Sequence, residues 1–192
     1  AMAIGFQLLF VLLWLGRKDG PAAMAWLIAV GIVWVATRAN ALLFIGVLAC
    51  VEAALERFAR PALLRTGLLL ACAIAAYKII VTLTGNHGQL VLFNFVFVDK
   101  PDGLAFPNPG FDPVGYVRAI VYGLFEAATQ FPEFFLCIGA LGWIVVENGR
   151  PLLQGHPPKD RDALIVATAM LLAIGGHFLL YPAAWERFFV GY

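Results

Sequence analysis

The sequence predicts an all-α fold: a polytopic integral membrane bundle of about six transmembrane helices, forming one domain over residues 1–192. Hydrophobic residues make up 62% of the chain and the mean hydropathy is +0.87. Only 13% of residues are charged, about half the fraction usual in soluble domains. The length accommodates about six spans of ~20 residues, and no polar segment is long enough for a separate soluble domain.

Apolar blocks and the polar, glycine or proline residues between them define the six helices. The first block is followed by positive charge rather than preceded by it, which is the reverse of a signal peptide, so we interpret it as a span. The predicted helices cover 2–16, 21–37, 40–56, 64–84, 117–147 and 163–182.

Positive charge is concentrated in alternate connections. The positive-inside rule therefore predicts that these connections are cytoplasmic and that both termini are non-cytoplasmic. The residues concerned are Arg17 and Lys18 after the first block, Arg57, Arg60 and Arg65 after the third, and Arg150, Lys159 and Arg161 after the fifth.

The connection 85–117 is much longer than the others. It combines a strand-like apolar run, 90–98, with several turn-forming sequences, and its aromatic content argues against disorder. We expect an ordered cap on the outer side of the bundle. The alternative is a belt segment whose Phe93, Phe95 and Phe97 anchor at the membrane interface.

The most unusual feature is a polar group within the fifth apolar block. Glu126, Gln130 and Glu133 are spaced four and three apart around Pro132, which places them on one face if the helix is continuous. Each ionisable group at membrane depth costs at least ~2.5 kcal/mol. The block is too long for a straight span, and Pro132 predicts a kink in it. We interpret the face as a ligand-binding site.

Two further residues fall at a similar predicted depth. Lys78 and His177 lie below the outer ends of their helices, where they could meet Glu126 beneath the cap. Glu133 would lie deeper and be protonated. The alternatives are that Lys78 snorkels to the interface, that His177 forms an ordinary interfacial hydrogen bond, and that the carboxyls contact a neighbouring subunit.

Other polar patterns indicate structure rather than chemistry. Glu52 and Glu56, with Arg60 one turn on, predict an ion-pair ladder at the inner boundary. The three cysteines lie in apolar runs and are expected to be small buried hydrophobes. No nucleotide-binding or hydrolase motif is present, and the histidine spacing does not support a haem or metal site. No cofactor is identified, and a net charge of +1 suggests no nucleic-acid partner.

The pattern E-x3-Q-x-P-x-F at Glu126, Gln130 and Pro132 resembles the second helix of the EXPERA superfamily, which includes emopamil-binding protein and the sigma-2 receptor. The resemblance covers 117–182 only. It implies that Glu126 is the acidic partner of a cationic or sterol-like ligand and that Gln130 and Pro132 shape the cavity. The leading helices have no counterpart in the simplest members, and the chain stops before a further helix expected in them.

Two functions follow from these observations. The first is a bundle that binds or converts a lipidic or amphiphilic small molecule at the acidic site. The second is a non-catalytic subunit of a larger membrane assembly, in which the same groups face a partner. Membrane lipid is the partner that composition implies, and the sequence leaves open whether any reaction is catalysed.

Overall fold

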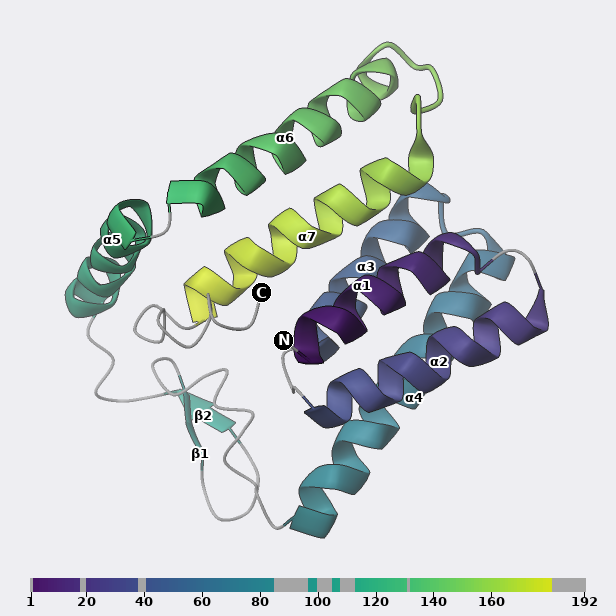
Figure 1. The fold of residues 1–192 in the computed structure, drawn as a ribbon, viewed down its shortest axis with the longest axis horizontal. Helices are drawn as coiled ribbons and strands as arrows, with labels where there is room; N and C mark the ends of the chain where they lie inside the picture. Colours follow the sequence, from purple (N-terminus) through teal and green to yellow (C-terminus); the bar gives the residue numbers. More distant parts are fainter. Residues whose placement is uncertain are drawn as a thin grey trace.

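The computed structural model describes residues 2–17, 20–37, 41–84, 97–99, 105–107, 113–130 and 132–180. Within them the chain is helical apart from one small hairpin and the turns and loops that join the helices (Figure 1). The helices are α1 (Met2–Leu15), α2 (Pro21–Thr37), α3 (Ala41–Leu55), α4 (Arg60–Thr84), α5 (Pro113–Gln130), α6 (Pro132–Leu153) and α7 (Arg161–Leu180), and the strands are β1 (Phe97–Asp99) and β2 (Ala105–Pro107).

The prediction of an all-α helical bundle is confirmed. Five predicted helices match α1, α2, α3, α4 and α7, and the bounds of α2 are those expected from the sequence. The agreement arises because proline, glycine and charged residues interrupt the apolar blocks where helices end.

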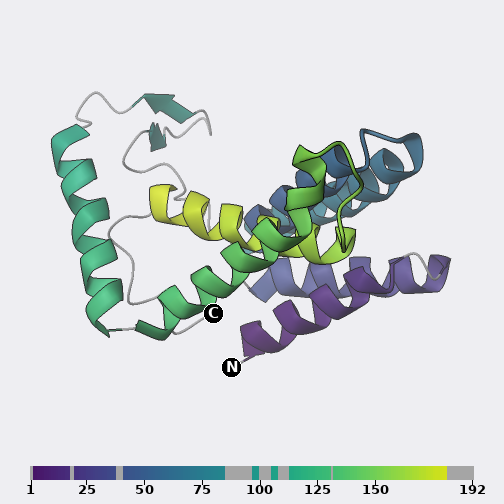
Figure 2. The same ribbon diagram turned by 90° about the horizontal axis from the view of Figure 1, so that it is seen from above.

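The predicted fifth helix is wrong as a single element, because 117–147 is divided between α5 and α6. Pro132 is the first residue of α6 rather than a kink within a helix. Proline has no N–H and a fixed φ, so it is well tolerated at a helix start and poorly tolerated in a helix interior. Figure 2 shows α5 and α6 meeting at a corner, with α5 directed away from the other helices.

The core lies among α1, α2, α3, α4 and α7. Phe10, Trp34 and Phe44 form an aromatic cluster in which ring centroids lie 5.4–6.5 Å apart. Gly31 of α2 permits the close approach of α1, because a Cβ there would lie 3.1 Å from the Phe10 ring. α6 packs along α7 on the outside of this core.

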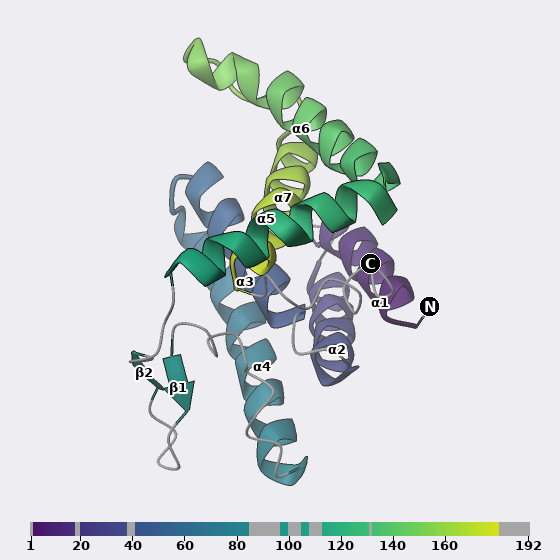
Figure 3. The same ribbon diagram turned by 90° about the vertical axis from the view of Figure 1, so that its left-hand side faces the viewer.

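The hairpin is antiparallel and pairs Phe97 with Pro107 and Asp99 with Ala105. It lies toward the end of the molecule at which α4 and α7 finish (Figures 1 and 3). Phe97 and Val98 of β1 belong to the predicted strand-like run 90–98, whereas β2 lies beyond it. The rest of that prediction, including Phe93 and Phe95, falls outside the described residues, and α5 already begins at Pro113.

The number of full-length spans differs from the prediction. Within the described residues, two helical segments, Arg60–Leu83 and Phe135–Leu153, are long and apolar enough to cross a membrane by length and composition. α1, α2 and α3 are apolar but have only 14, 17 and 15 residues, fewer than the ~20 that a 30 Å hydrocarbon layer requires. The six-span prediction counted such short blocks as full spans.

The outer faces of the helices are strongly apolar. Leu12, Trp26 and Leu64 are each 65% exposed, and Leu136 of α6 is 75% exposed. The cysteine prediction is wrong for the same reason, since Cys50 and Cys137 are exposed on apolar faces and Cys72 is intermediate. An apolar sequence run could not separate residues that face the core from those that face outward.

Candidate functional site

Two side chains of the predicted acidic site, those of Lys78 and Glu133, lie among the described residues. Lys78 is exposed on α4, and Glu133 is exposed in the first turn of α6. The side chains of Glu126, Gln130 and His177 lie outside the described residues. Because the helix is broken between Gln130 and Pro132, Glu133 does not share a continuous helical face with the other two. A carboxylate in a first turn is also favoured by the helix dipole.

The main polar cluster lies elsewhere, at the end of the bundle where α1 and α3 finish and α7 begins. Arg17 is 3% exposed and Glu52 2% exposed, and Arg17 Nε donates to Glu52 Oε1 at 2.8 Å. Arg17 Nη2 donates to Asp162 Oδ1 of α7 at 3.2 Å. Trp14 Nε1 donates to Glu52 Oε2 at 3.1 Å, and the Arg17 guanidinium carbon lies 3.4 Å from the centroid of the Trp14 ring.

The predicted ladder of Glu52, Glu56 and Arg60 is corrected in its cation. Arg65 Nη2 bridges Glu52 Oε1 at 3.3 Å and Glu56 Oε2 at 3.1 Å, whereas Arg60 is exposed. The turn between α3 and α4 reverses the chain, so Arg65 on the second helical turn of α4 faces α3. The buried charges of Arg17 and Glu52 are paired and hydrogen-bonded, as their burial requires, whereas Arg65 Nε is buried without a hydrogen-bond partner among the described residues. This cluster fixes α1, α3, α4 and α7 at one end.

That shared end also confirms one part of the charge argument. Each of the three basic connections has a residue in this cluster or beside it. Arg17 and Arg65 both pair with Glu52, and Asp162 pairs with Arg17. The alternate connections therefore lie at the same end of the bundle.

A basic pocket of about 380 Å³ opens beside this cluster. It lies between the turn that follows α3 and the loop that joins α6 to α7. Arg57, His156 and Arg161 are its exposed cationic or titratable residues. Within the described part of the chain, neither Arg57 nor Arg161 has an ion-pair partner. The lining is completed by Leu55, Glu56, Leu152, Gly155, Pro157 and Pro158.

Two similar helix C-terminal turns build the pocket. At the end of α6, the N–H of Gly155 donates to Leu152 O and that of His156 donates to Pro151 O. Gly155 has φ +76°, the left-handed conformation that this cap favours. At the end of α3, the N–H of Arg57 donates to Ala54 O and that of Phe58 to Ala53 O. Arg57 thus occupies with φ 53° a position that normally takes glycine.

The loop between α6 and α7 is fixed to α6 by Asn148. Its Oδ1 accepts from the N–H of Asp160 at 3.1 Å, and its main-chain oxygen accepts from the N–H of Lys159 at 3.3 Å. On the surface, Lys159 Nζ donates to Glu147 Oε1 at 2.6 Å. This hydrogen bond and the Glu147 charge raise the pKa of Lys159 above 10.5. These contacts hold His156 and Arg161 beside the pocket.

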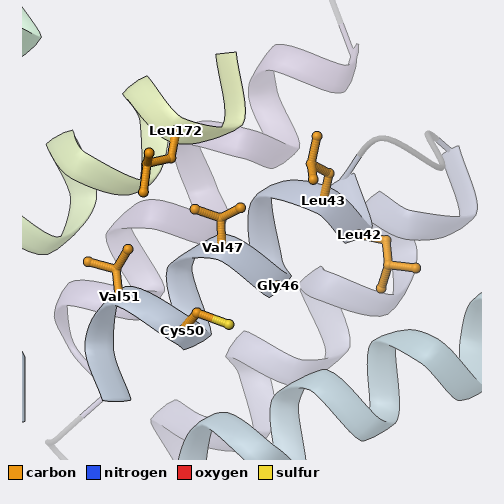
Figure 4. A pocket seen from close by; sticks show the side chains of 7 residues that line it. All are labelled: Leu42, Leu43, Gly46, Val47, Cys50, Val51 and Leu172. Carbon is orange, nitrogen blue, oxygen red and sulfur yellow. The ribbon is translucent and has the colours of Figure 1, made fainter. Parts of the chain in front are cut away.

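A shallow, open apolar groove of about 480 Å³ runs along α3, and Leu172 is the one residue of α7 in its lining. Figure 4 shows Val47 and Val51 of α3 on the side that faces Leu172 of α7, with Gly46 leaving space between the neighbouring side chains. The whole lining is apolar and consists of Leu42, Leu43, Gly46, Val47, Cys50, Val51 and Leu172. It offers no polar group for catalysis.

The groove and the basic pocket adjoin along the same pair of helices. Val51 of the groove and Leu55 of the pocket are one turn apart on α3, about 6 Å. On α7, Arg161 of the pocket precedes Leu172 of the groove, in the antiparallel sense. The arrangement places a wholly apolar lining beside a cationic end.

Sequence reasoning used Arg57, Arg161 and the other basic residues only to assign orientation, and placed His156 only in a connection. One sequence feature could have indicated the pocket. The two basic connections that line it, after α3 and between α6 and α7, lie on the same side of the predicted topology. No protein-family model matches the chain, and no curated protein and no solved structure is similar to it. The resemblance to the EXPERA superfamily over 117–182 therefore rests only on the pattern of Glu126, Gln130, Pro132 and Phe134 within that range.

Proposed function

We propose that this chain is a multi-pass membrane protein that binds a lipidic amphiphile, with the hydrocarbon chain lying in the α3–α7 groove. The observation that carries the proposal is the wholly apolar groove ending one helical turn from a basic pocket. The basic end is cytoplasmic, following the positive-inside rule.

The outward faces support membrane embedding. Leucine and tryptophan side chains are exposed on α1, α2, α4 and α6, where contact with water would be unfavourable by ~25 cal/mol per Å² of apolar surface. Contiguous exposed apolar surface indicates a membrane or protein interface. Helices as short as α1 and α3 are accommodated in a bilayer by local thinning or tilt of the neighbouring spans.

The groove can hold a hydrocarbon chain along much of α3. From Leu43 to Val51 the helix rises about 12 Å, and Leu43, Val47 and Val51 line the groove along this path.

Native mass spectrometry of the detergent-solubilised protein with added phosphatidylcholine tests the proposal. Cys50→Trp fills the groove, whereas Cys137→Trp adds the same side chain to the exposed face of α6, outside the groove. Wild type and Cys137→Trp are expected to retain a lipid that Cys50→Trp loses. Equal retention by both variants would overturn the proposal.

The acidic site stays a prediction within the same functional class. It would bind the polar part of an amphiphile through Glu126, as the resemblance implies. Glu126→Gln tests it in the same experiment: loss of a retained cationic small molecule would support that site, and unchanged retention would contradict it.

A second function, assembly with a partner subunit, is favoured by α6. Only 6% of its candidate span is buried, against 28% of the span in α4. Val117, Val121 and Phe125 also leave α5 with an exposed apolar face. Size-exclusion chromatography with light scattering tests it: a stoichiometric partner lost on Leu136→Glu would support assembly, and a monomer in detergent would contradict self-association.

A further inference from the structure

We propose that the basic pocket of Arg57, His156 and Arg161 binds the phosphate-bearing headgroup of an anionic phospholipid whose chain occupies the α3–α7 groove. This inference rests on the proposed function and adds the chemical class of the ligand. The headgroup is the part of the lipid that the protein would select.

The groove by itself cannot provide selectivity. A hydrocarbon chain that enters the groove moves there from among other lipid tails, which are as apolar as leucine. The free-energy gain is therefore small and the same for every lipid. Discrimination must come from polar groups at the end of the groove. The basic pocket is the polar site that adjoins the groove along α3.

The charge of the pocket fits an anion. Arg57 and Arg161 have no carboxylate partner among the described residues. The acidic residue in the lining, Glu56, is bridged to Arg65 at 3.1 Å. Guanidinium groups offer several donors that match phosphate oxygens. Among the described residues, no carboxylate therefore neutralises the two arginines of the pocket.

Backbone geometry supports a binding role for Arg57 in particular. Gly155 and Arg57 occupy the same position in two equivalent helix caps, and both have positive φ. Glycine adopts this conformation without the penalty that a Cβ adds. Arg57 therefore has a strained backbone and also lines the pocket, and such strain is typical of residues with a function. The helix cap alone does not explain the arginine, because glycine would complete the cap.

The two arginines indicate the depth of the site. Arg57 follows the end of α3 and Arg161 begins α7, and both are exposed. Arginines near the ends of membrane helices direct their charges to the interface. This places the pocket at headgroup level.

The test compares retention of phosphatidylglycerol and phosphatidylcholine with identical chains, by native mass spectrometry in detergent. Each basic group near an anionic headgroup contributes about a five-fold preference, so two arginines predict about 30-fold for wild type. Arg57→Gly and Arg161→Gln should each reduce the preference about five-fold. Arg150→Gln removes an exposed arginine at the same end but outside the pocket, and should leave the preference unchanged.

Arg57→Gly separates binding from folding. Because glycine suits the backbone at this position, the variant is expected to be at least as resistant to thermal unfolding as wild type while losing selectivity. Loss of selectivity together with lower stability in this variant would overturn the assignment.

The outcomes distinguish the two proposals. If both lipids are retained equally and Cys50→Trp releases both, the groove is supported and the headgroup site is wrong. If Cys50→Trp releases neither, the proposed function itself is wrong. If inorganic phosphate binds the Cys50→Trp protein at Arg57 and Arg161 as strongly as wild type retains phosphatidylglycerol, the ligand is a soluble phosphate and the lipid assignment is overturned.

Discussion

Arg17 Nε donates to Glu52 Oε1 at 2.8 Å across 35 sequence positions, and both side chains are buried. This pair joins the end of α1 to the last turn of α3, and Arg17 continues to Asp162 at the start of α7. These contacts join α1, α3 and α7 at the end of the bundle where the basic pocket opens. The residues that line the groove belong to α3 and α7.

Arg17→Met is expected to lower the free energy of unfolding by about 3 kcal/mol, because Glu52 loses a buried partner while it keeps Arg65. Unfolding in mixed detergent and dodecyl sulfate micelles measures the change. Arg60→Gln is the control, since Arg60 is exposed, and should change stability by less than about 0.5 kcal/mol. The double variant Arg17→Met, Glu52→Met should recover much of the loss, and an additive loss would contradict coupling of the pair.

Asn148→Ala is expected to loosen the loop that precedes α7, because the N–H of Asp160 loses its acceptor. A cost of about 1 kcal/mol is typical for such a hydrogen bond. Hydrogen–deuterium exchange over 154–160 should rise in this variant and not in Gln154→Ala, whose side chain is exposed in the same loop. Unchanged exchange would show that Asn148 does not position the loop.

Lys159 should titrate above its ordinary pKa of 10.5. Glu147 accepts a hydrogen bond from the Lys159 ammonium group, and the negative charge of Glu147 favours the protonated form. Because the pKa of Lys159 is higher in the folded protein than in the unfolded protein, its pair with Glu147 stabilises the fold fully at pH values below the unfolded-state pKa. This stabilisation is lost as the pH rises through the folded-state pKa. NMR titration of the ¹³C-methylated lysines measures it. Glu147→Gln should return the Lys159 signal to an ordinary pKa, and a signal that does not move would contradict the pair.

Gly31→Ala is expected to destabilise the protein by about 1 kcal/mol or more, because the added Cβ would lie 3.1 Å from the fully buried Phe10 ring. The ring is held by Trp34 and Phe44 and cannot easily move. Gly139→Ala on α6 has open space around it and should be neutral or stabilising by up to ~1 kcal/mol. Measured in one detergent, the thermal midpoint of Gly31→Ala should lie below that of wild type, whereas that of Gly139→Ala should not.

Helix positions were predictable because breakers and apolar blocks are local features. The error at Pro132 shows the limit of that reasoning: a proline fits either a kink or a helix start, and the choice depends on how α6 packs on α7. The three polar residues at 126–133 were assigned to one face only because the helix was taken as continuous.

The basic pocket and the buried cluster could not be derived in the same way. Arg60 is close to Glu56 in sequence, yet Arg65 is the partner, since the turn at Arg57 sets the direction of α4. The Arg17–Glu52 pair depends on the packing of α1 against α3, which no local pattern encodes. Apolar periodicity was equally uninformative, because both faces of the helices are apolar.

Photo-crosslinking with a phospholipid that carries a diazirine on its acyl chain tests whether a lipid chain lies in the α3–α7 groove. After reconstitution and irradiation, mass spectrometry maps the labelled residues. We expect labelling concentrated at Val47, Cys50 and Leu172, and its loss in Cys50→Trp but not in Cys137→Trp. Labelling spread evenly over the exposed faces of α1, α4 and α6, or unchanged by Cys50→Trp, would contradict a lipid site in the α3–α7 groove.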